Sequence, residues 1–109
     1  MLYRLNERDW EGMRYVFCDR AEMERVCDEE EIEDREAEEI EVSDDVVQLL
    51  KETAHETLDM GEGLQEVFDG VASAYINRGR ELVNFIEYLR EAEFDDLAER
   101  WESFTEVLR

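Results

Sequence analysis

The stretch from Cys27 to Asp45 constrains the folding of this chain most strongly, because twelve of its nineteen residues are acids and only Arg35 is basic. Acids four residues apart on a helix, such as Glu29 and Glu33, are like-charged neighbours, which destabilises the helix. We therefore expect 28–38 to form a frayed helix end or a solvated loop. This acidic run, defined as residues 27–45, separates an N-terminal part of the chain from a C-terminal part.

The first eighteen residues predict a small antiparallel β element. Leu2–Leu5 is short and of extended type, and Met13–Cys18 alternates in polarity. The residues expected on one face of the second strand are Met13, Tyr15 and Phe17. Gly12 lies between the two segments, which predicts a hairpin with a longer loop around residues 9–11.

Short elements are expected on both sides of the acidic loop. Asp19 is a suitable N-cap for a short helix. The apolar residues that follow it at helical spacing are Met23, Val26 and Cys27. After the loop, acids alternate with β-branched residues, so Ile40 and Val42 are predicted to form a short strand over 39–42 that faces the core.

Helix signals dominate the remainder of the chain. Ser43 is a good N-cap, and the two acids after it favour the helix dipole. The residues expected on the apolar face of this helix are Val47, Leu50, Ala54 and Leu58. Gly61–Gly63 is expected to end it.

A second apolar stripe begins at Leu64 and keeps a heptad spacing. Its members are Leu64, Phe68, Val71, Tyr75, Leu82, Phe85 and Leu89, with Arg78 in the missing position. A break or kink is expected near Asn77 and Gly79, which leaves open whether this segment is one kinked helix or two. The stripe is expected to form core, and a homodimer seam is the alternative. A last helix is predicted from Asp95, with Leu97, Trp101, Phe104 and Leu108 on its apolar face.

Together these patterns predict an α+β fold that is mostly helical, in which a small N-terminal antiparallel β element packs with three to four amphipathic helices. We expect one domain over 1–109, with a β-rich part at 1–18, a short helix and the acidic run at 19–45, and a helical part at 44–109. Apolar residues make up 43% of the chain, with five Phe, four Tyr and two Trp. That content excludes an intrinsically disordered chain.

No motif indicates an enzyme. The segment HETLD at 55–59 differs from a zinc-protease helix because Asp59 stands where a second histidine is needed, and His55 is the only histidine. Cys18 and Cys27 have only that histidine as a base, in strongly negative surroundings that disfavour a thiolate. The segment GEGLQE at 61–66 lacks the third glycine and the lysine of a phosphate loop. The acidic run lacks the ligand spacing and central glycine of a calcium loop. We expect no catalytic residue, no cofactor and no dedicated metal site.

The charge balance limits the class of partner. The chain has 12 basic and 33 acidic residues, for a net charge of −21. This charge excludes bulk attraction to a nucleic-acid backbone or an anionic membrane and favours a cationic partner. The first twenty residues hold Glu7, Asp9 and Glu11 and no continuous apolar stretch, so neither a secretory signal nor a membrane span is predicted. Two cysteines are too few for a disulfide framework, and we expect reduced thiols in a cytoplasm.

The charge also matches that of DNA. A compact chain of this length is roughly 35–40 Å long, and duplex DNA of that length carries about 20–24 charges. In size, composition and charge the chain resembles the acidic DNA-mimic inhibitors of phages and plasmids, the antirestriction and anti-CRISPR proteins. The resemblance includes no shared motif, so no residue is carried over. It implies an inhibitor in the host cytoplasm that occupies the basic nucleic-acid-binding surface of a nuclease or CRISPR effector.

Three alternatives remain open. An antitoxin or immunity-type protein that neutralises a basic nuclease needs a similar acidic face. A salt-adapted, haloarchaeal cytoplasmic protein would also be acidic, although Glu outnumbers Asp by 23 to 10 and the acids are clustered. A helical adaptor is the third.

We expect the acidic run to supply the partner-binding residues. These are Asp28, Glu29, Glu30, Glu31, Glu33, Asp34, Glu36, Glu38, Glu39, Glu41, Asp44 and Asp45. Acids of the later helices are expected to extend the same face, among them Glu62, Glu66, Asp69, Glu91, Asp95 and Asp96. Apolar contacts with the partner are expected from whichever of Trp10, Tyr88 and Trp101 is exposed.

Overall fold

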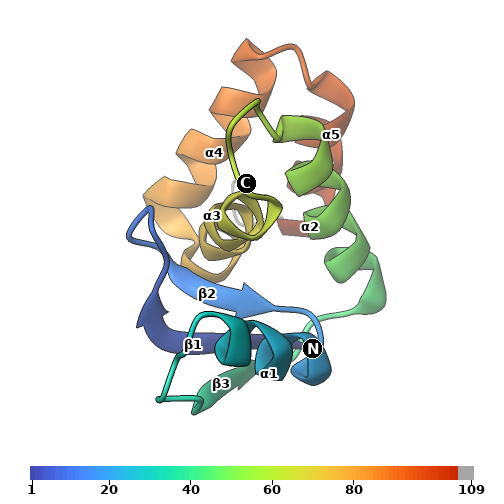
Figure 1. Ribbon diagram of the computed structural model, residues 1–109. Helices are drawn as coiled ribbons and strands as arrows, with labels where there is room; N and C mark the ends of the chain where they lie inside the picture. Colours follow the sequence, from blue (N-terminus) through green and yellow to red (C-terminus); the bar gives the residue numbers. More distant parts are fainter. Residues whose placement is uncertain (106–109) are drawn as a thin grey trace.

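The structure, a computed structural model, describes residues 1–105 and contains three strands and five helices. They are β1 (Leu2–Arg8), β2 (Arg14–Phe17), α1 (Arg20–Glu29), β3 (Ala37–Ile40), α2 (Asp44–Thr57), α3 (Leu64–Asn77), α4 (Gly79–Glu91) and α5 (Asp95–Thr105). The sheet and α1 lie at one end, and α2 to α5 form a helical layer over the sheet (Figure 1). The predicted α+β fold is confirmed, with five helices in the described part of the chain rather than three or four.

The sheet is antiparallel, in the order β2-β1-β3. Tyr3 pairs with Phe17, and the register shifts further along β1, close to the turn. The hairpin loop is fixed by Asp9, whose Oδ1 accepts hydrogen bonds from the backbone N–H groups of Glu11 and Met13 at 2.9 and 3.0 Å. The predicted hairpin and its longer loop are therefore confirmed.

Helix α1 and the loop after it follow the sequence prediction closely. The Asp19 side chain caps the helix by accepting from the backbone N–H of Ala21 at 2.7 Å. The predicted apolar residues Met23, Val26 and Cys27 are buried. The helix ends at Glu29, where the dense acids begin, and an irregular loop leads to β3. Ile32 in this loop is also buried, which the sequence prediction missed.

The third strand lies two residues earlier than predicted, at 37–40 rather than 39–42. In this register Ile40 pairs with Leu2, and Glu38 lies opposite Arg4. The Arg4 guanidinium and the Glu38 carboxylate form an ion pair at 2.5 Å. This cross-strand attraction favours the observed register, and Val42 packs against the core from outside the strand.

Helix α2 begins as predicted, with the Ser43 hydroxyl accepting from the Val46 N–H at 3.3 Å. The predicted apolar face is partly wrong, because Val47 is only half buried and Leu58 lies past the helix end, 39% exposed. The buried residues are Val46, Leu49, Leu50, Thr53 and Ala54. Thr53 fixes this orientation, because its hydroxyl accepts a hydrogen bond from the indole Nε1 of Trp101 at 2.9 Å.

The heptad stripe is divided between two helices, α3 and α4. The break falls at Arg78, whose φ of 56° is rare for a residue with a side chain. Most members of the stripe are buried within the chain, as predicted: Phe68, Val71, Tyr75, Leu82 and Leu89. Leu64 is exposed, contrary to the core prediction. The homodimer seam stays a prediction.

The last helix, α5, begins at the predicted residue and buries Trp101 completely. The indole packs against the rings of Phe85 and Tyr75, with centroids 4.8 and 6.1 Å away. Phe104, predicted on the apolar face, is 40% exposed. Leu108 lies outside the described residues.

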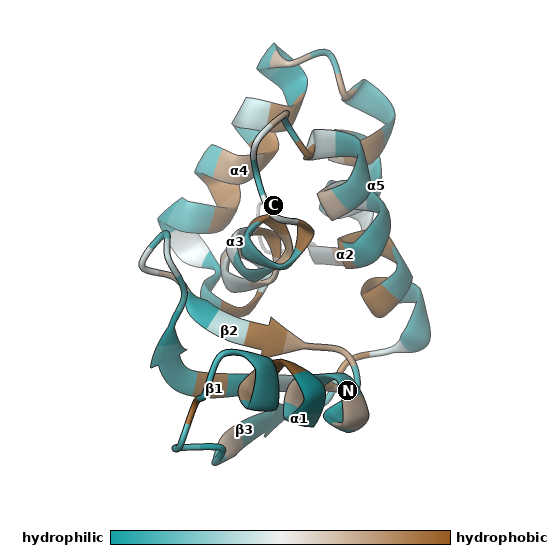
Figure 2. Cartoon of the chain, viewed as in Figure 1, coloured by the Kyte–Doolittle hydropathy of each residue, from teal (hydrophilic) through white to brown (hydrophobic). Residues whose placement is uncertain are grey.

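The sheet is covered on both faces, so the molecule has two hydrophobic clusters. Leu2 and Val16 face the helical layer and belong to the larger cluster. Leu5 and Phe17 face α1 and belong to the smaller cluster. Apolar residues accordingly line the inner faces of both layers (Figure 2). The two clusters hold the apolar side chains inside and leave nearly all of the acids on the outer surface.

Replacing Gly70 with Ala should stabilise the fold. Gly70 lies in the interior of α3, and a Cβ added there would meet no atom within 4 Å. Alanine in a helix interior is favoured over glycine by about 0.5–1 kcal/mol. We expect urea denaturation to show a gain of that size. A loss of stability would mean that the space above Gly70 is closed.

Candidate functional site

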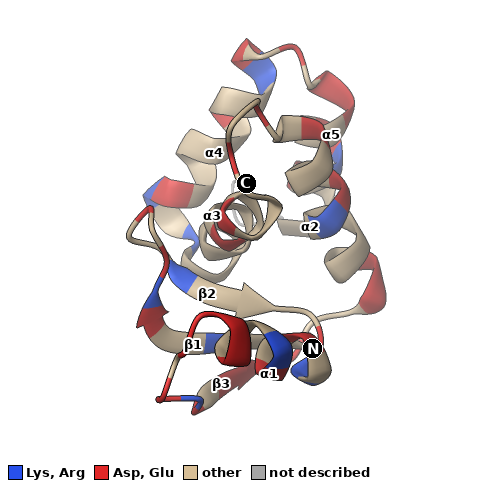
Figure 3. Cartoon of the chain, viewed as in Figure 1, with Lys and Arg blue, Asp and Glu red and all other residues tan. Residues whose placement is uncertain are grey.

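The acidic run follows the end of the molecule that holds the sheet. It starts in the last turn of α1, continues through the loop and β3, and reaches the first turn of α2 (Figure 3). The twelve predicted partner-binding acids are all exposed. The structure therefore places every one of them where a partner can reach it.

These twelve acids divide into two groups by their ion pairs. Four are paired with arginines of this chain: Asp28, Glu29, Glu38 and Glu39. The other eight form no ion pair with any described residue: Glu30, Glu31, Glu33, Asp34, Glu36, Glu41, Asp44 and Asp45. This second group keeps its charge free for a partner.

One base and one apolar residue attach the acidic loop to the rest of the molecule. Ile32 anchors the loop in the cluster beneath α1. The Arg35 Nε donates to the Ile32 carbonyl at 3.1 Å, and its guanidinium pairs with Asp28 at 2.7 Å. Asp34 adds a turn by accepting from the Glu36 N–H at 3.2 Å. The unpaired carboxylates are thus displayed from a defined backbone.

Part of this acidity has a structural explanation. β3 is an edge strand, and charged side chains on an edge strand prevent it from pairing with another chain. Glu38 and Glu39 lie on this strand and are paired with Arg4 and Arg20. Edge protection explains these two acids but not the unpaired acids of the preceding loop.

Of the six acids predicted to extend the acidic face, Asp69 is buried and cannot do so, and the extension by the other five stays a prediction. Glu62, Glu91, Asp95 and Asp96 are exposed, and Glu66 is half buried. Asp69 is completely buried and belongs to no surface. Among the aromatic candidates, Trp10 is 89% exposed and Tyr88 is 45% exposed, whereas Trp101 is buried.

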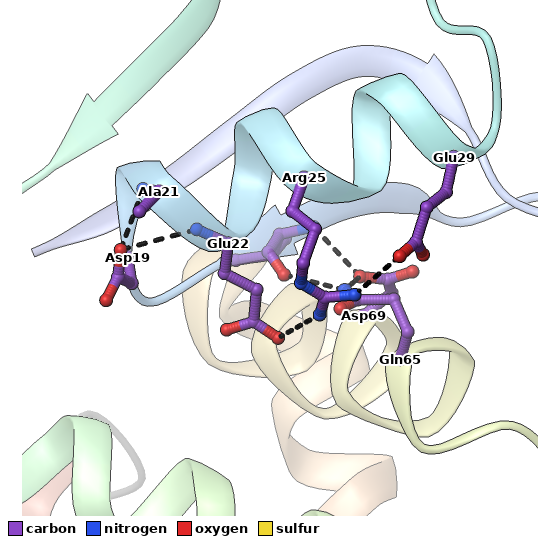
Figure 4. A network of polar contacts seen from close by, with 8 residues as sticks. Asp19, Ala21, Glu22, Arg25, Glu29, Gln65 and Asp69 are labelled. Carbon is purple, nitrogen blue, oxygen red and sulfur yellow. Dashed lines mark hydrogen bonds and ion pairs between the residues drawn. The ribbon is translucent and has the colours of Figure 1, made fainter.

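A cleft of about 840 Å³ opens between α1, β2 and the ends of α2 and α3 that face them. Its walls include the only lysine and the only histidine of the chain, Lys51 and His55, one turn apart on α2. Across the cleft on α1, Arg25 lies between Glu22 and Glu29 and pairs with both (Figure 4). Acids and bases are mixed in this lining, so it shows no preference for one sign of charge.

The two thiols and the HETLD segment are poorly suited to catalysis, and of their titratable groups only Cys18 and His55 line the cleft. Burial raises the pKa of the Cys18 thiol, and the positive charge of Lys51 only partly opposes this. Burial also raises the pKa of Cys27. Asp59 lies beyond the end of α2, so it does not share a helix with His55. Among the described residues, no three His, Cys, Asp or Glu side chains are grouped to hold a metal ion.

Asp69 joins the helical layer to the sheet. Its Oδ1 accepts from the Val16 backbone N–H at 2.9 Å and from the Gln65 amide at 2.6 Å. The same amide donates to the Val16 carbonyl at 2.9 Å. Two side chains of α3 therefore satisfy the outward-facing backbone groups of edge strand β2, as a neighbouring strand would (Figure 4).

The second oxygen of Asp69 is shared with Asp9 of the hairpin loop. Both Oδ2 atoms are buried, and no N–H or hydroxyl of the described residues donates to them, so a proton between the two carboxyl groups is the only hydrogen bond open to them. Burial and a hydrogen bond with Asp9 raise the pKa of Asp69 to about 9. A proton retained on Asp69 satisfies both oxygens and removes one of two buried charges. One signal could have revealed this group, because Asp69 is the only charged residue between Val67 and Ile76.

No protein-family model, curated protein sequence or solved structure matches this chain. No helix in residues 1–105 has the length and apolar character needed to cross a membrane.

Replacing Asp69 with Asn tests the shared proton. The raised pKa means that the folded protein retains a proton that the unfolded chain releases above its ordinary pKa of 3.8. This contribution to stability is complete below about pH 4 and is lost as the pH rises to about 9. Asparagine keeps an acceptor for Val16 and a donor for Asp9 without titrating. The free energy of unfolding of Asp69→Asn, relative to wild type, should therefore rise with pH between these limits.

Asp69→Leu provides the matched control. It leaves the Val16 N–H without an acceptor and should cost about 1–3 kcal/mol. Parallel pH profiles for wild type and Asp69→Asn, from urea denaturation, would contradict the shared proton.

Proposed function

We propose that this protein is an inhibitor that imitates DNA, of the antirestriction or anti-CRISPR type. It occupies the basic nucleic-acid-binding surface of a host defence protein. The observation that supports this proposal most strongly is the ratio of net charge to the length of the molecule. The Cα atoms extend 39 × 31 × 22 Å, and duplex DNA 39 Å long carries about 23 negative charges. The only charged residues outside the described range 1–105 are Glu106 and Arg109, so the described residues also carry −21.

The position of the acids supports this proposal. Of the 32 acids among the described residues, only Asp9 and Asp69 are buried. The remainder lie on both layers of the molecule (Figure 3). A basic groove that follows the long axis would meet carboxylates along its length, as it meets phosphates along a duplex.

The contacts that attach the acidic loop to the fold also support the proposal. A flexible polyanion loses conformational entropy when it binds, whereas a folded display of carboxylates has lost that entropy already. Ile32 and Arg35 hold the acidic loop in place. Arg35, the only base of the acidic run, therefore neutralises one carboxylate, Asp28, but helps to position the others for a partner.

Changing unpaired acids of the acidic run should weaken inhibition without unfolding the protein. Glu30, Glu33, Glu36 and Glu41 are exposed and form no ion pair with the described residues. The fourfold Gln variant should bind the partner about ten- to a hundredfold more weakly, and the fourfold Lys variant more weakly still. A matched control changes the same number of exposed acids at the opposite end, Glu87, Glu91, Glu93 and Glu99. Equal losses in both fourfold Gln variants would show that only total charge matters.

Salt dependence separates a folded mimic from a simple polyanion. DNA releases condensed counterions when it binds, so its affinity falls steeply with salt. A globular protein condenses fewer counterions and adds apolar contacts, for example from Trp10. The dissociation constants of one purified nuclease or CRISPR effector for duplex DNA and for this protein should be measured between about 50 and about 300 mM salt. We expect the shallower slope for the protein.

Polyglutamate of matched net charge is the control that tests whether inhibition needs the folded scaffold. Inhibition by polyglutamate equal to that by the folded protein would contradict the proposal. Binding at a surface that does not exclude DNA would instead favour the antitoxin or adaptor alternatives.

A further inference from the structure

A second surface, away from the acidic run, has features of a docking site. A groove of about 320 Å³ runs along α3 between the loop that joins α2 to α3 and helix α4. Val67 and Gly70 of α3 form its floor, and Phe85 and Tyr88 of α4 form one wall. The space above Gly70 is open, since a Cβ there would touch nothing.

The charged residues that line this groove are all acidic. They are Glu11 from the hairpin, Asp59 and Glu62 from the loop, and Glu66 from α3. None of them forms an ion pair with a described residue. The larger cleft differs, because bases and acids are mixed there. A positive side chain would therefore be attracted into the groove and not into the cleft.

The aromatic wall is rigid and suits a flat cation. Phe85 packs on the fully buried Trp101 at 4.8 Å between ring centroids. Tyr88 lies 6.1 Å from Phe85 and is 45% exposed. Guanidinium groups stack on such rings and bind carboxylates in two-pronged fashion. Lysine has the charge but not the planar shape.

The rim of the groove exposes apolar side chains. Met60 is fully exposed and Leu58 is 39% exposed, both on the loop that supplies Asp59 and Glu62 to the groove. Exposed apolar side chains rimmed by acids are typical of protein–protein contact sites.

We infer that this groove binds an arginine side chain from an exposed segment of a partner protein, with an apolar residue of that segment resting on Met60. The inference rests on the proposed function only in assuming a basic partner. The acidic run would supply long-range attraction, and the groove would supply a local anchor.

The test uses a peptide, acetyl-Leu-Arg-Gly-Arg-Leu-amide, and its counterpart with citrulline in place of both arginines. Citrulline keeps the planar shape but has no charge. We expect the arginine peptide to shift the backbone amide resonances of Gly70, Asp59 and Tyr88, and to bind at least about tenfold more tightly than the citrulline peptide. No shift with the arginine peptide, or equal binding of both peptides, would overturn the inference.

Variants at Gly70 locate the site. Gly70→Leu projects a side chain into the open groove and should weaken arginine-peptide binding by about tenfold or more, whereas Gly70→Ala should stay within about threefold of wild type. Tyr88→Leu gives a second reading that does not depend on the helix backbone, with a loss of about three- to tenfold. Thermal unfolding confirms that each variant is folded. Unchanged binding by folded Gly70→Leu would overturn the inference.

The fourfold Gln variant of the acidic run separates this inference from the proposed function. This variant should bind the arginine peptide within about threefold of wild type. The changed acids lie at the end of the molecule that holds the sheet, and salt screens their charge at the groove. If the peptide fails to bind while DNA is still displaced from the partner, the groove is excluded and the DNA-mimic proposal stands. If the peptide binds and DNA is not displaced, the groove inference stands and the DNA-mimic proposal is excluded.

Discussion

The contact between the Asp69 side chain and the Val16 backbone is a buried polar link between the two layers of this molecule. Together with Gln65 it satisfies the backbone N–H and C=O of Val16 at the free edge of β2. Asp69 lies beside Asp9, which fixes the hairpin loop through its own hydrogen bonds. A buried carboxyl is costly unless it is hydrogen-bonded and neutral. Burial beside Asp9 raises the pKa of Asp69 to about 9, and a proton held there at neutral pH would meet both conditions. A proton on Asp69 would remove the charge repulsion between Asp69 and Asp9, the two buried acids. The hydrogen bond from Val16 to Asp69 then holds the sheet against the helices.

Repulsion among the remaining acids shapes the rest of the fold. Each of the two hydrophobic clusters excludes charge, so the acids lie outside. Ion pairs with individual arginines reduce this repulsion locally, as between Arg4 and Glu38 and between Arg35 and Asp28. It leaves most of the loop between α1 and β3 unneutralised. A surface in which some acids are paired and a contiguous set is left free is the arrangement expected for recognition of a basic partner.

The sequence predicted the elements whose signals are local. The Asp19 and Ser43 caps, the hairpin and the break near Arg78 depend on neighbouring residues, and all are confirmed. The failures involve contacts distant in sequence. The strand at 37–40 is set by the pairing of Glu38 with Arg4, the face of α2 by Trp101, and the burial of Asp69 by Val16. The exposure of the acidic run followed from its charge, but the anchoring of that loop by Ile32 and the groove along α3 required the tertiary structure.

The central claim is that this protein and duplex DNA compete for one surface of a basic partner. The most direct test measures the mass of the complexes formed when a purified nuclease or CRISPR effector is mixed with saturating amounts of both. The account predicts two binary complexes and no ternary one, with the DNA complex decreasing as this protein is added. A stable ternary complex that contains partner, DNA and this protein would contradict it.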